Sequence, residues 1–518
     1  MTAKRFILGL LTLLAIARVL LSLGGSLTEP QINSRLELYQ TNLVLYASEL
    51  QTDEDENLSN AIAKALGDEP TANAIEQYNK TRKEVIALRQ AFQKQLAPAV
   101  AEENNAQDVA LEVSKQEIAT PREQLKQQLS QLNNFIDEID VKRGILAAVN
   151  GDTTSAREIW QQLIDRLEDP EDEYSQTAAT LSQLWSKNPQ FDANTETIIK
   201  DNLDSWFRDR SLARLYEISD NTSQLTALNE ARQTIASQAI FKLAFISGIP
   251  FFGGFVGFIL LISVLVQLLI KKENAVLATN NNLKWQTPWD WEITWQVVIV
   301  GFFFVGQFLL PFFLGIIGLN VAEASLREKA LYVLFTYLLM AAGGIFVLYL
   351  SVKPYLPLSE EWFKTKLRDN WFVWGFGGYL IAIPCVLLVS LINQQIWQGQ
   401  GGSNPLLYLA LQAQDRVALA IFFFTASIAA PVFEEVMFRG FLLPSLTRYF
   451  SVTTSIVLSG LLFAIAHLSL AEVLPLATLG IILGIVYTRS RNILAPMLLH
   501  SLWNSGTLLS LFVLGSGT

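Results

Sequence analysis

The second half of the chain consists largely of apolar runs that are long enough to cross a lipid bilayer. About 20 consecutive apolar residues are needed to span the hydrocarbon core as a helix. Backbone groups facing lipid must be paired within their own segment, so these runs predict an all-α, polytopic transmembrane helical bundle of about eight or nine spans. We expect spans at Ile249–Ile270, Trp295–Gly318, Leu331–Val352, Trp371–Ile392, Val417–Val436, Thr454–Leu470, Leu474–Thr488 and Ile493–Leu514.

The N-terminus carries a further apolar segment. Lys4 and Arg5 precede a stretch from Phe6 to Leu23 that only Arg18 interrupts. A basic flank before an apolar run is typical of a signal peptide or an uncleaved anchor. No clean small-x-small cleavage pattern follows, which favours a membrane anchor or signal segment over residues 1–29 that stays in place as a ninth span.

Residues 30–235 differ sharply from the rest, because they are rich in Gln, Asn, Glu, Asp and Lys. Apolar residues recur there at helical spacing, and Asn150-Gly151-Asp152 separates two such helices as a turn. We expect a soluble helical domain, faintly tetratricopeptide-like although without a clean 34-residue period. Recruitment of a protein partner and a plain helical spacer are the two roles that this pattern allows.

Composition excludes several classes of function. Charged residues make up only 17% of the chain, and the net charge is −10. Nucleic acid is therefore not an expected partner, because phosphate binding needs clustered Lys and Arg. The single cysteine, Cys385, allows neither an internal disulfide nor a cysteine-based zinc site.

Basic residues flank the predicted spans on alternate sides. By the positive-inside rule, this pattern places the N-terminus in the cytoplasm and residues 30–235 outside. The loop 320–330, with Arg327 and Lys329, fits less well. The flanking residues on the expected inner side are Lys271, Lys272, Lys353, Lys364, Lys366, Arg368, Arg439, Arg448, Arg489 and Arg491.

Two adjacent carboxylates stand out within the membrane half. Residues 371–435 contain only four charged side chains, Asp415, Arg416, Glu434 and Glu435. Ionisable groups in a span are costly and usually face a cavity or a partner. Arg439 lies four residues after Glu435 on the same helix face, so we expect an ion pair that leaves Glu434 free. The alternative is an interfacial charge cluster at a span end.

The only two histidines of the chain, His467 and His500, lie in late apolar segments. Asn504 follows His500 at i+4, on the same helical face. Each residue alone could simply form a hydrogen bond in the core or between two helices. Because they follow the only adjacent carboxylate pair inside a predicted span, their joint occurrence favours a functional site within residues 415–515, after transmembrane helices within residues 240–410.

The motifs Glu434-Glu435-x-x-x-Arg439, Phe463-x-x-x-His467 and His500-x-x-x-Asn504 together resemble the CPBP family. This family contains the CAAX-processing, Rce1-type membrane proteases and their bacteriocin-immunity relatives. All three motifs match in order and residue type over about residues 415–515, which the resemblance identifies as a CPBP-like intramembrane protease core.

The resemblance implies an intramembrane endopeptidase that acts on a membrane-associated peptide or protein. Glu434 and His467 would hold and activate a water, His500 and Asn504 would stabilise the oxyanion, and Glu435 and Arg439 would orient the first pair. The enzyme could be metallo- or glutamate-dependent, because Glu434, His467 and His500 are also a sufficient ligand set for a divalent metal such as zinc.

Two other functions remain open on the sequence. A non-catalytic immunity or binding module could use the same fold, but no motif residue is missing. A proton-coupled transporter would use the same buried carboxylates, but no convincing internal repeat of the kind found in transporters is present. Whether a substrate carries a prenyl group cannot be read from these residues.

Overall fold

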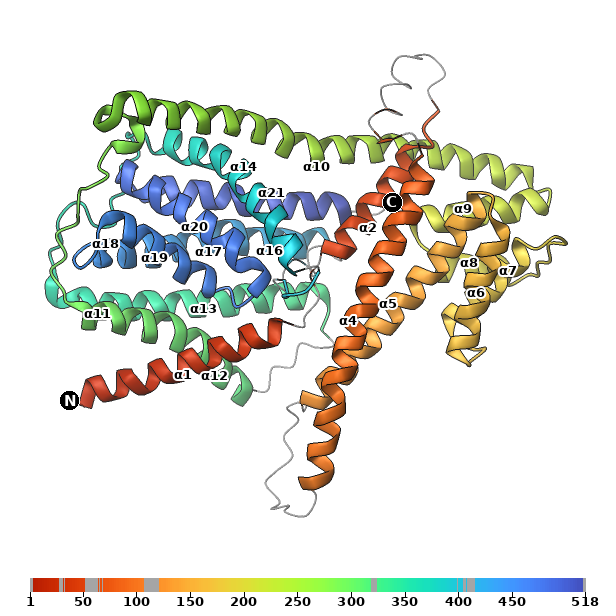
Figure 1. The fold of residues 1–518 in the computed structure, drawn as a ribbon, viewed down its shortest axis with the longest axis horizontal. Helices are drawn as coiled ribbons and strands as arrows, with labels where there is room; N and C mark the ends of the chain where they lie inside the picture. Colours follow the sequence, from red (N-terminus) through yellow and green to blue (C-terminus); the bar gives the residue numbers. More distant parts are fainter. Residues whose placement is uncertain are drawn as a thin grey trace. The chain divides into compact units, whose positions relative to one another are not determined.

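The computed structural model describes residues 3–27, 31, 33–51, 64, 66–67, 69–106, 121–317, 324–397, 399–403, 407 and 415–515. Within these ranges the regular elements are helices, and no β-strand forms (Figure 1). The chain divides into two compact units. One comprises Asn33–Phe245, and the other comprises Met1–Ile32 together with Ile246–Ser516. We call them the polar unit and the membrane unit.

The polar unit is a set of packed helices. The predicted break at Asn150-Gly151-Asp152 is confirmed, because one helix ends at Val149 and the next begins at Thr153. The Asp152 carboxylate caps the second helix by accepting from the Ser155 N–H at 3.0 Å. The helices are α2 (Asn33–Ala47), α4 (Pro70–Ala106), α5 (Pro121–Val149), α6 (Thr153–Leu167), α7 (Glu173–Leu184), α8 (Thr195–Asn202), α9 (Ser205–Ile218) and the first half of α10 (Thr222–Lys271).

A buried carboxylate fixes α4, α5 and α6 to one another. Asp140 on α5 accepts from Arg82 at 2.5 Å, from Arg143 at 2.8 Å and from Arg166 at 3.0 Å. Burial by itself would raise the pKa of Asp140, but these three guanidinium groups outweigh it and lower that pKa. The pair network therefore contributes to stability at neutral pH.

The polar unit also contains a cavity of about 950 Å³ between the end of α2, α9 and the start of α10. Its wall includes Glu49, which forms ion pairs with both Arg210 and Arg232. Nothing in these contacts identifies a bound molecule, so a protein partner for this region stays a prediction.

The membrane unit contains the remaining helices. These are α1 (Ala3–Ser26), the second half of α10, η1 (Lys272–Asn274), η2 (Val276–Ala278), α11 (Trp291–Gln296), the π-helical η3 (Val297–Leu309), α12 (Leu310–Ile317), α13 (Leu326–Val352), η4 (Lys353–Tyr355), α14 (Trp371–Trp397), α16 (Arg416–Phe424), η5 (Thr425–Ala429), α17 (Ala430–Glu435), η6 (Val436–Leu442), α18 (Leu443–Leu446), α19 (Val452–Ile465), α20 (Leu470–Ser490) and α21 (Leu494–Gly515).

Eight helices in the described residues are long and apolar enough to cross a membrane, and the chain is a multi-pass integral membrane protein. One predicted span, Thr454–Leu470, is wrong. Its helix, α19, has 14 residues, and at 1.5 Å per residue it reaches about 21 Å, short of the roughly 30 Å core. The chain turns at Leu468, which adopts a positive φ of 60°. The next span, predicted as Leu474–Thr488, accordingly begins earlier, at Leu470.

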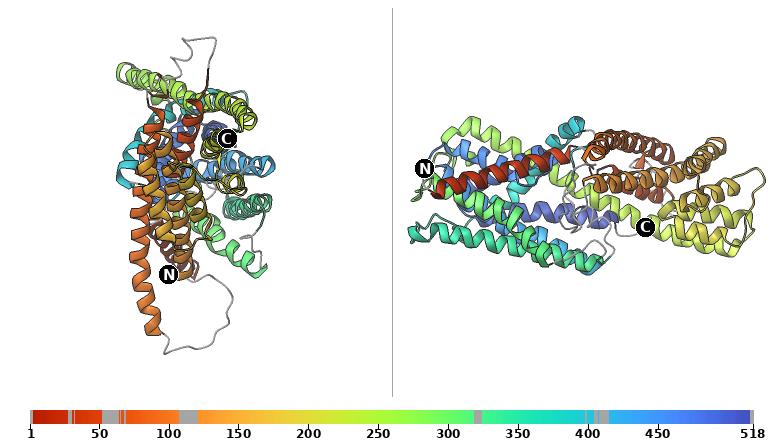
Figure 2. Two further views of the ribbon diagram at one scale, coloured as in Figure 1. Left: turned by 90° about the vertical axis from the view of Figure 1, so that its right-hand side faces the viewer. Right: turned by 90° about the horizontal axis from the view of Figure 1, so that it is seen from below.

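The N-terminal helix α1 packs against η3 within the membrane unit (Figures 1 and 2). Trp295 donates from its indole to the Thr12 hydroxyl at 2.7 Å. Lys4 and Arg5 both pair with Glu292, at 3.0 and 2.8 Å. Direct side-chain bonds thus hold this helix against the bundle.

One end of the membrane unit gathers the connections that carry basic residues. Arg489 donates from Nε to the Leu277 carbonyl at 2.6 Å, and Asn492 donates to the Lys366 carbonyl at 2.7 Å. Segments after α10, α13 and α20 therefore meet there. At the opposite end the start of α20 meets α1, because the Leu470 N–H donates to the Ser26 hydroxyl at 3.2 Å.

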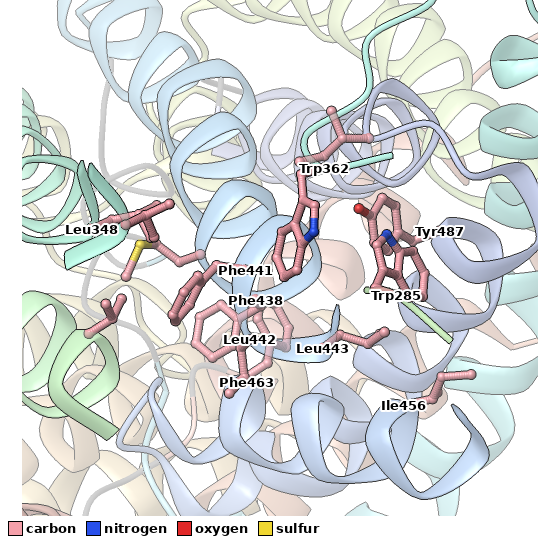
Figure 3. Close-up of a cluster of buried hydrophobic side chains, with 14 of the residues drawn as sticks. Trp285, Leu348, Trp362, Phe438, Phe441, Leu442, Leu443, Ile456, Phe463 and Tyr487 are labelled. Carbon is pink, nitrogen blue, oxygen red and sulfur yellow. The ribbon is translucent and has the colours of Figure 1, made fainter. Parts of the chain in front are cut away.

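A core rich in aromatic side chains lies between η6, α19, α20 and the loop segments around Trp285 and Trp362 (Figure 3). Trp285 stacks on Tyr487 with ring centroids 5.3 Å apart. Phe438 of η6 meets Phe463 of α19 edge to face at 5.5 Å. This packing ties η6, which follows the two adjacent glutamates, to the end of α19.

Candidate active site

The two carboxylates lie on an irregular stretch of helix. Glu434 and Glu435 end α17, a six-residue α-helical segment between the π-helical segments η5 and η6. A π-helix adds a residue to the turn, and such bulges occur frequently at functional sites. The side chains on α17 therefore lie in a different register from the one that an unbroken helix would give.

Glu435 is the centre of a buried charge network. Its side chain and that of Arg439 are both fully buried, and Oε1 accepts from Arg439 Nη1 at 2.7 Å. The same oxygen is 2.9 Å from Nδ1 of His500 on α21. The expected ion pair between Glu435 and Arg439 is present, and it holds His500 as well.

Arg439 is fixed from two further sides. Its Nη2 donates to the Gly480 carbonyl at 3.0 Å, and its guanidinium lies over the Phe463 ring, 4.5 Å from the centroid. A Cβ at Gly480 would lie 2.9 Å from the Gly460 Cα, so α19 and α20 can meet at this depth only without side chains. This close crossing brings α20 and its carbonyl within reach of Arg439.

Phe463 contacts both imidazole rings. Its ring lies edge to face with that of His467 at 4.9 Å and with that of His500 at 5.5 Å. The phenyl ring is completely buried. The two histidines, which are 33 positions apart in the sequence, therefore share one aromatic neighbour in the fold.

Glu434 is oriented differently from its neighbour and keeps 15% of its side chain exposed. Its Oε1 accepts from the hydroxyl of Tyr337 on α13 at 3.1 Å. Its Oε2 is 3.9 Å from Nε2 of His500. Glu434 is thus not paired with Arg439, and part of its side chain is accessible, whereas Glu435 is fully buried.

The fold also determines which nitrogen of His467 is available. His467 lies in the turn after α19, with Nδ1 2.8 Å from the Phe463 carbonyl. A carbonyl oxygen only accepts, so Nδ1 must carry the proton in this bond. In the neutral ring, Nε2 then has a free lone pair that can accept a hydrogen bond from water.

Asn504 compensates for a proline in the facing helix. In η5 the Ala430 N–H donates to the Thr425 carbonyl, five residues back. The next N–H in this pattern would belong to Pro431 and would reach Ala426, but proline has none. Asn504 instead donates from Nδ2 to the Ala426 carbonyl at 2.7 Å. This bond fixes the amide and leaves its second N–H for another acceptor.

The sequence alone had not indicated three of these contacts. Tyr337, Pro431 and Gly480 each bond or position one of the predicted residues, but none of them is a charged or histidine residue in an apolar run. Their contribution comes from where their helices pack. All six predicted residues lie in this region of the membrane unit, on α17, η6, α21 and the turn after α19.

Glu434, His467 and His500 are the side chains that the sequence offers as ligands for a metal ion. In the part of the chain that the structure describes, no three His, Cys, Asp or Glu side chains lie together as a ligand set. A metal ion held by Glu434, His467 and His500 stays a prediction. Nδ1 of His500 faces Glu435, and Nδ1 of His467 is bound to its own turn, so Nε2 is the nitrogen that each ring leaves for another partner.

Comparison with known proteins finds a family model that is similar to the same stretch. Residues 416–506 match the family model described as type II CAAX prenyl endopeptidase Rce1-like. The C-terminal region therefore resembles the Rce1-like proteases of the CPBP type. The match begins at α16 and ends within α21, and so it encloses all six predicted site residues.

Two curated proteins resemble parts of this chain. The "Membrane-embedded CAAX protease MroQ" of Staphylococcus aureus is 25% identical over 187 residues, which cover 35% of this chain and 73% of that protein. The "Putative membrane peptidase YdiL" of Bacillus subtilis is 24% identical over 133 residues, 26% of this chain and 53% of that protein. No solved structure matches.

Replacing Arg439 by Met should strongly destabilise the Rce1-like region. Glu435 would remain buried without its counter-charge, and removing one partner of a buried pair costs about 3–5 kcal/mol. The control is Arg327→Met, which breaks a pair with Asp415 in which the arginine is 60% exposed, so little or no loss of stability is expected. Thermal unfolding in detergent micelles measures both, and equal losses would contradict the assignment.

The bond of Asn504 to Ala426 can be separated from any catalytic role. Asn504→Ala leaves the Ala426 carbonyl unpaired, which should cost about 1–3 kcal/mol of stability. In a Pro431→Ala background the new N–H of residue 431 can pair with this carbonyl, so Asn504→Ala should then cost less stability. A loss of stability that is the same in both backgrounds would show that Pro431 does not create the need for Asn504.

Proposed function

We propose that the chain is an intramembrane endopeptidase that cleaves a membrane-associated peptide or protein. The family match and the two similar proteins support a membrane protease at the level of the family. One observation carries the finer proposal. Glu434 remains partly exposed while its neighbour Glu435 is fully buried and neutralised by Arg439.

In this proposal Glu434 is the general base. One water is held between the Glu434 carboxylate and Nε2 of His467, whose lone pair is available because Nδ1 donates to the Phe463 carbonyl. The water oxygen attacks the carbonyl carbon of the scissile bond, and Glu434 takes its proton. Glu434 then returns this proton to the leaving amine as the C–N bond breaks.

His500 and Asn504 act on the oxyanion. Nδ1 of His500 is bound to Glu435, so Nε2 is the nitrogen left to face the reacting centre, where it donates to the oxyanion when it carries a proton. The second N–H of the Asn504 amide is a further donor, fixed by the first. Donors that are in place before the reaction stabilise the developing charge without reorganisation, and one such donor is worth about 3–4 kcal/mol.

Substitutions at the base and at the water-binding histidine should abolish cleavage. Glu434→Gln keeps the shape of the side chain but cannot take a proton, and a general base contributes roughly 10²–10⁴-fold. His467→Ala removes the second water contact. The test is cleavage of fluorogenic membrane-anchored peptides, with and without an isoprenyl group on a C-terminal cysteine, by the purified chain in liposomes.

Glu360→Gln, an exposed carboxylate in the loop after η4, is the matched control and should cleave like the wild type. Folded Glu434→Gln and His467→Ala variants that also cleave at the wild-type rate would refute the mechanism. Comparison of the two kinds of peptide also measures whether the substrate must be prenylated.

We further propose that the basic end of the membrane unit faces the cytoplasm. The connections that carry Lys353, Lys364, Lys366 and Arg489 meet at this end, as the positive-inside rule requires of a cytoplasmic side. The α20 start and the Ser26 end of α1 lie at the other end. This arrangement would place residues 33–245, which follow α1, outside.

Single-cysteine labelling tests the orientation. In a Cys385→Ser background, a cysteine at the exposed Thr222 should react with a membrane-impermeant maleimide in intact cells. A cysteine at the exposed Ser359, in the loop after η4, should react only after lysis. The reverse pattern would overturn the orientation.

A further inference from the structure

Tyr337 comes from a part of the chain that neither the motifs nor the family match reaches. It lies on α13, whereas the match covers residues 416–506. Its hydroxyl is 3.1 Å from Oε1 of Glu434. An ionised carboxylate only accepts, so the phenol donates in this bond.

The position of this phenol is set by close packing of α13 against α17. Tyr337, Ala341 and Leu348 pack on the core that contains Phe433, and Gly344 lies on the same face of α13. A Cβ at Gly344 would lie 2.9 Å from the Phe433 ring, so glycine allows the two helices to approach. The Tyr337 ring then meets Phe433 edge to face, with centroids 6.2 Å apart.

Glu434 has three flexible side-chain torsions and lies in partly exposed surroundings. His500 approaches Oε2 from α21 at 3.9 Å, which is too long for a direct hydrogen bond. The bond from Tyr337 is therefore the contact that fixes the Glu434 carboxylate, and it leaves Oε2 on the side of His500. Holding a catalytic group in one orientation lowers the entropy that must be lost in the reaction.

We propose that Tyr337 is a positioning residue for Glu434, and that α13 is in this way part of the active site. The inference rests on the proposed function of Glu434 as the base. Tyr337 does not touch the reacting atoms in this proposal. It holds Oε1, so that Oε2 is directed to the water.

The kinetic test replaces Tyr337 by Phe, which keeps the ring and its contact with Phe433. We expect kcat to fall roughly 10- to 100-fold with little change in KM, because misplacing a reacting group by about 1 Å can cost roughly 100-fold in rate. Tyr349→Phe removes the same atom from the same helix at a ring that is 52% exposed, and it should leave both constants unchanged. An unchanged kcat in Tyr337→Phe, with active wild type, would overturn the inference.

A second measurement does not depend on cleavage. Dicyclohexylcarbodiimide modifies carboxyl groups in apolar surroundings, and tandem mass spectrometry resolves adduct on Glu434 from adduct on Glu435. We expect Glu434 to be modified faster in Tyr337→Phe than in the wild type or in Tyr349→Phe, because its carboxylate is released. Equal rates in all three proteins would overturn the inference.

The two measurements separate this inference from the proposed function. If the wild type cleaves no peptide, or if Glu434→Gln cleaves like the wild type, the peptidase mechanism fails. The labelling rate of Glu434 then still decides whether Tyr337 holds this carboxylate.

Discussion

The fully buried ion pair between Glu435 and Arg439 is the interaction around which the membrane unit is organised. A charge buried in an apolar bundle is tolerable only when it is paired and hydrogen-bonded. Arg439 meets this requirement with groups from three elements, namely the carboxylate of Glu435, the carbonyl of Gly480 and the ring of Phe463. Oε1 of Glu435 also forms a hydrogen bond with His500. The pair thus fixes α17, α19, α20 and α21 relative to one another.

This pair also gives the two adjacent glutamates different surroundings. Glu435 is bound to Arg439 and His500 and is fully buried, so it cannot contact a substrate. Glu434 lies outside this network, because adjacent residues on a helix point to different sides. Its neighbours come from α13 and α21, and they are a phenol and an imidazole rather than a guanidinium. The same residue type therefore has one structural and one proposed chemical role at neighbouring positions.

Backbone irregularity is the second constraint on the site. The π-helical segments η5 and η6 flank α17, and Pro431 removes a donor that the π pattern requires. Asn504 supplies the missing bond from α21. The orientation of the Asn504 amide is thus linked to a defect in the helix that carries the glutamates. Close helix packing at glycines also shapes the site. Gly344, Gly460 and Gly480 allow α13, α19 and α20 to approach closely enough for hydrogen bonds between helices.

The change in composition along the chain predicts its division into a polar part and an apolar part. The membrane unit depends on hydropathy, which is a local property, and most spans could therefore be predicted within a few residues. The span predicted at Thr454–Leu470 failed because apolar residues continue through a turn. Hydropathy does not distinguish a helix from a turn that is buried in protein. The left-handed conformation of Leu468, which ends this helical path, is decided by packing around it.

The sequence by itself determined the membrane class, the helical polar region, the Glu435–Arg439 pair and the six candidate site residues. These follow from properties that a linear pattern carries, such as hydropathy, i to i+4 spacing and the rarity of ionisable groups in apolar runs. Only the tertiary structure decided that Tyr337 bonds Glu434 and that Asn504 replaces the N–H of Pro431. The physical reason is that hydrogen bonds between distant helices depend on approach distances and helix register, and glycine contacts and π-helical turns set these without leaving a periodic trace in the sequence.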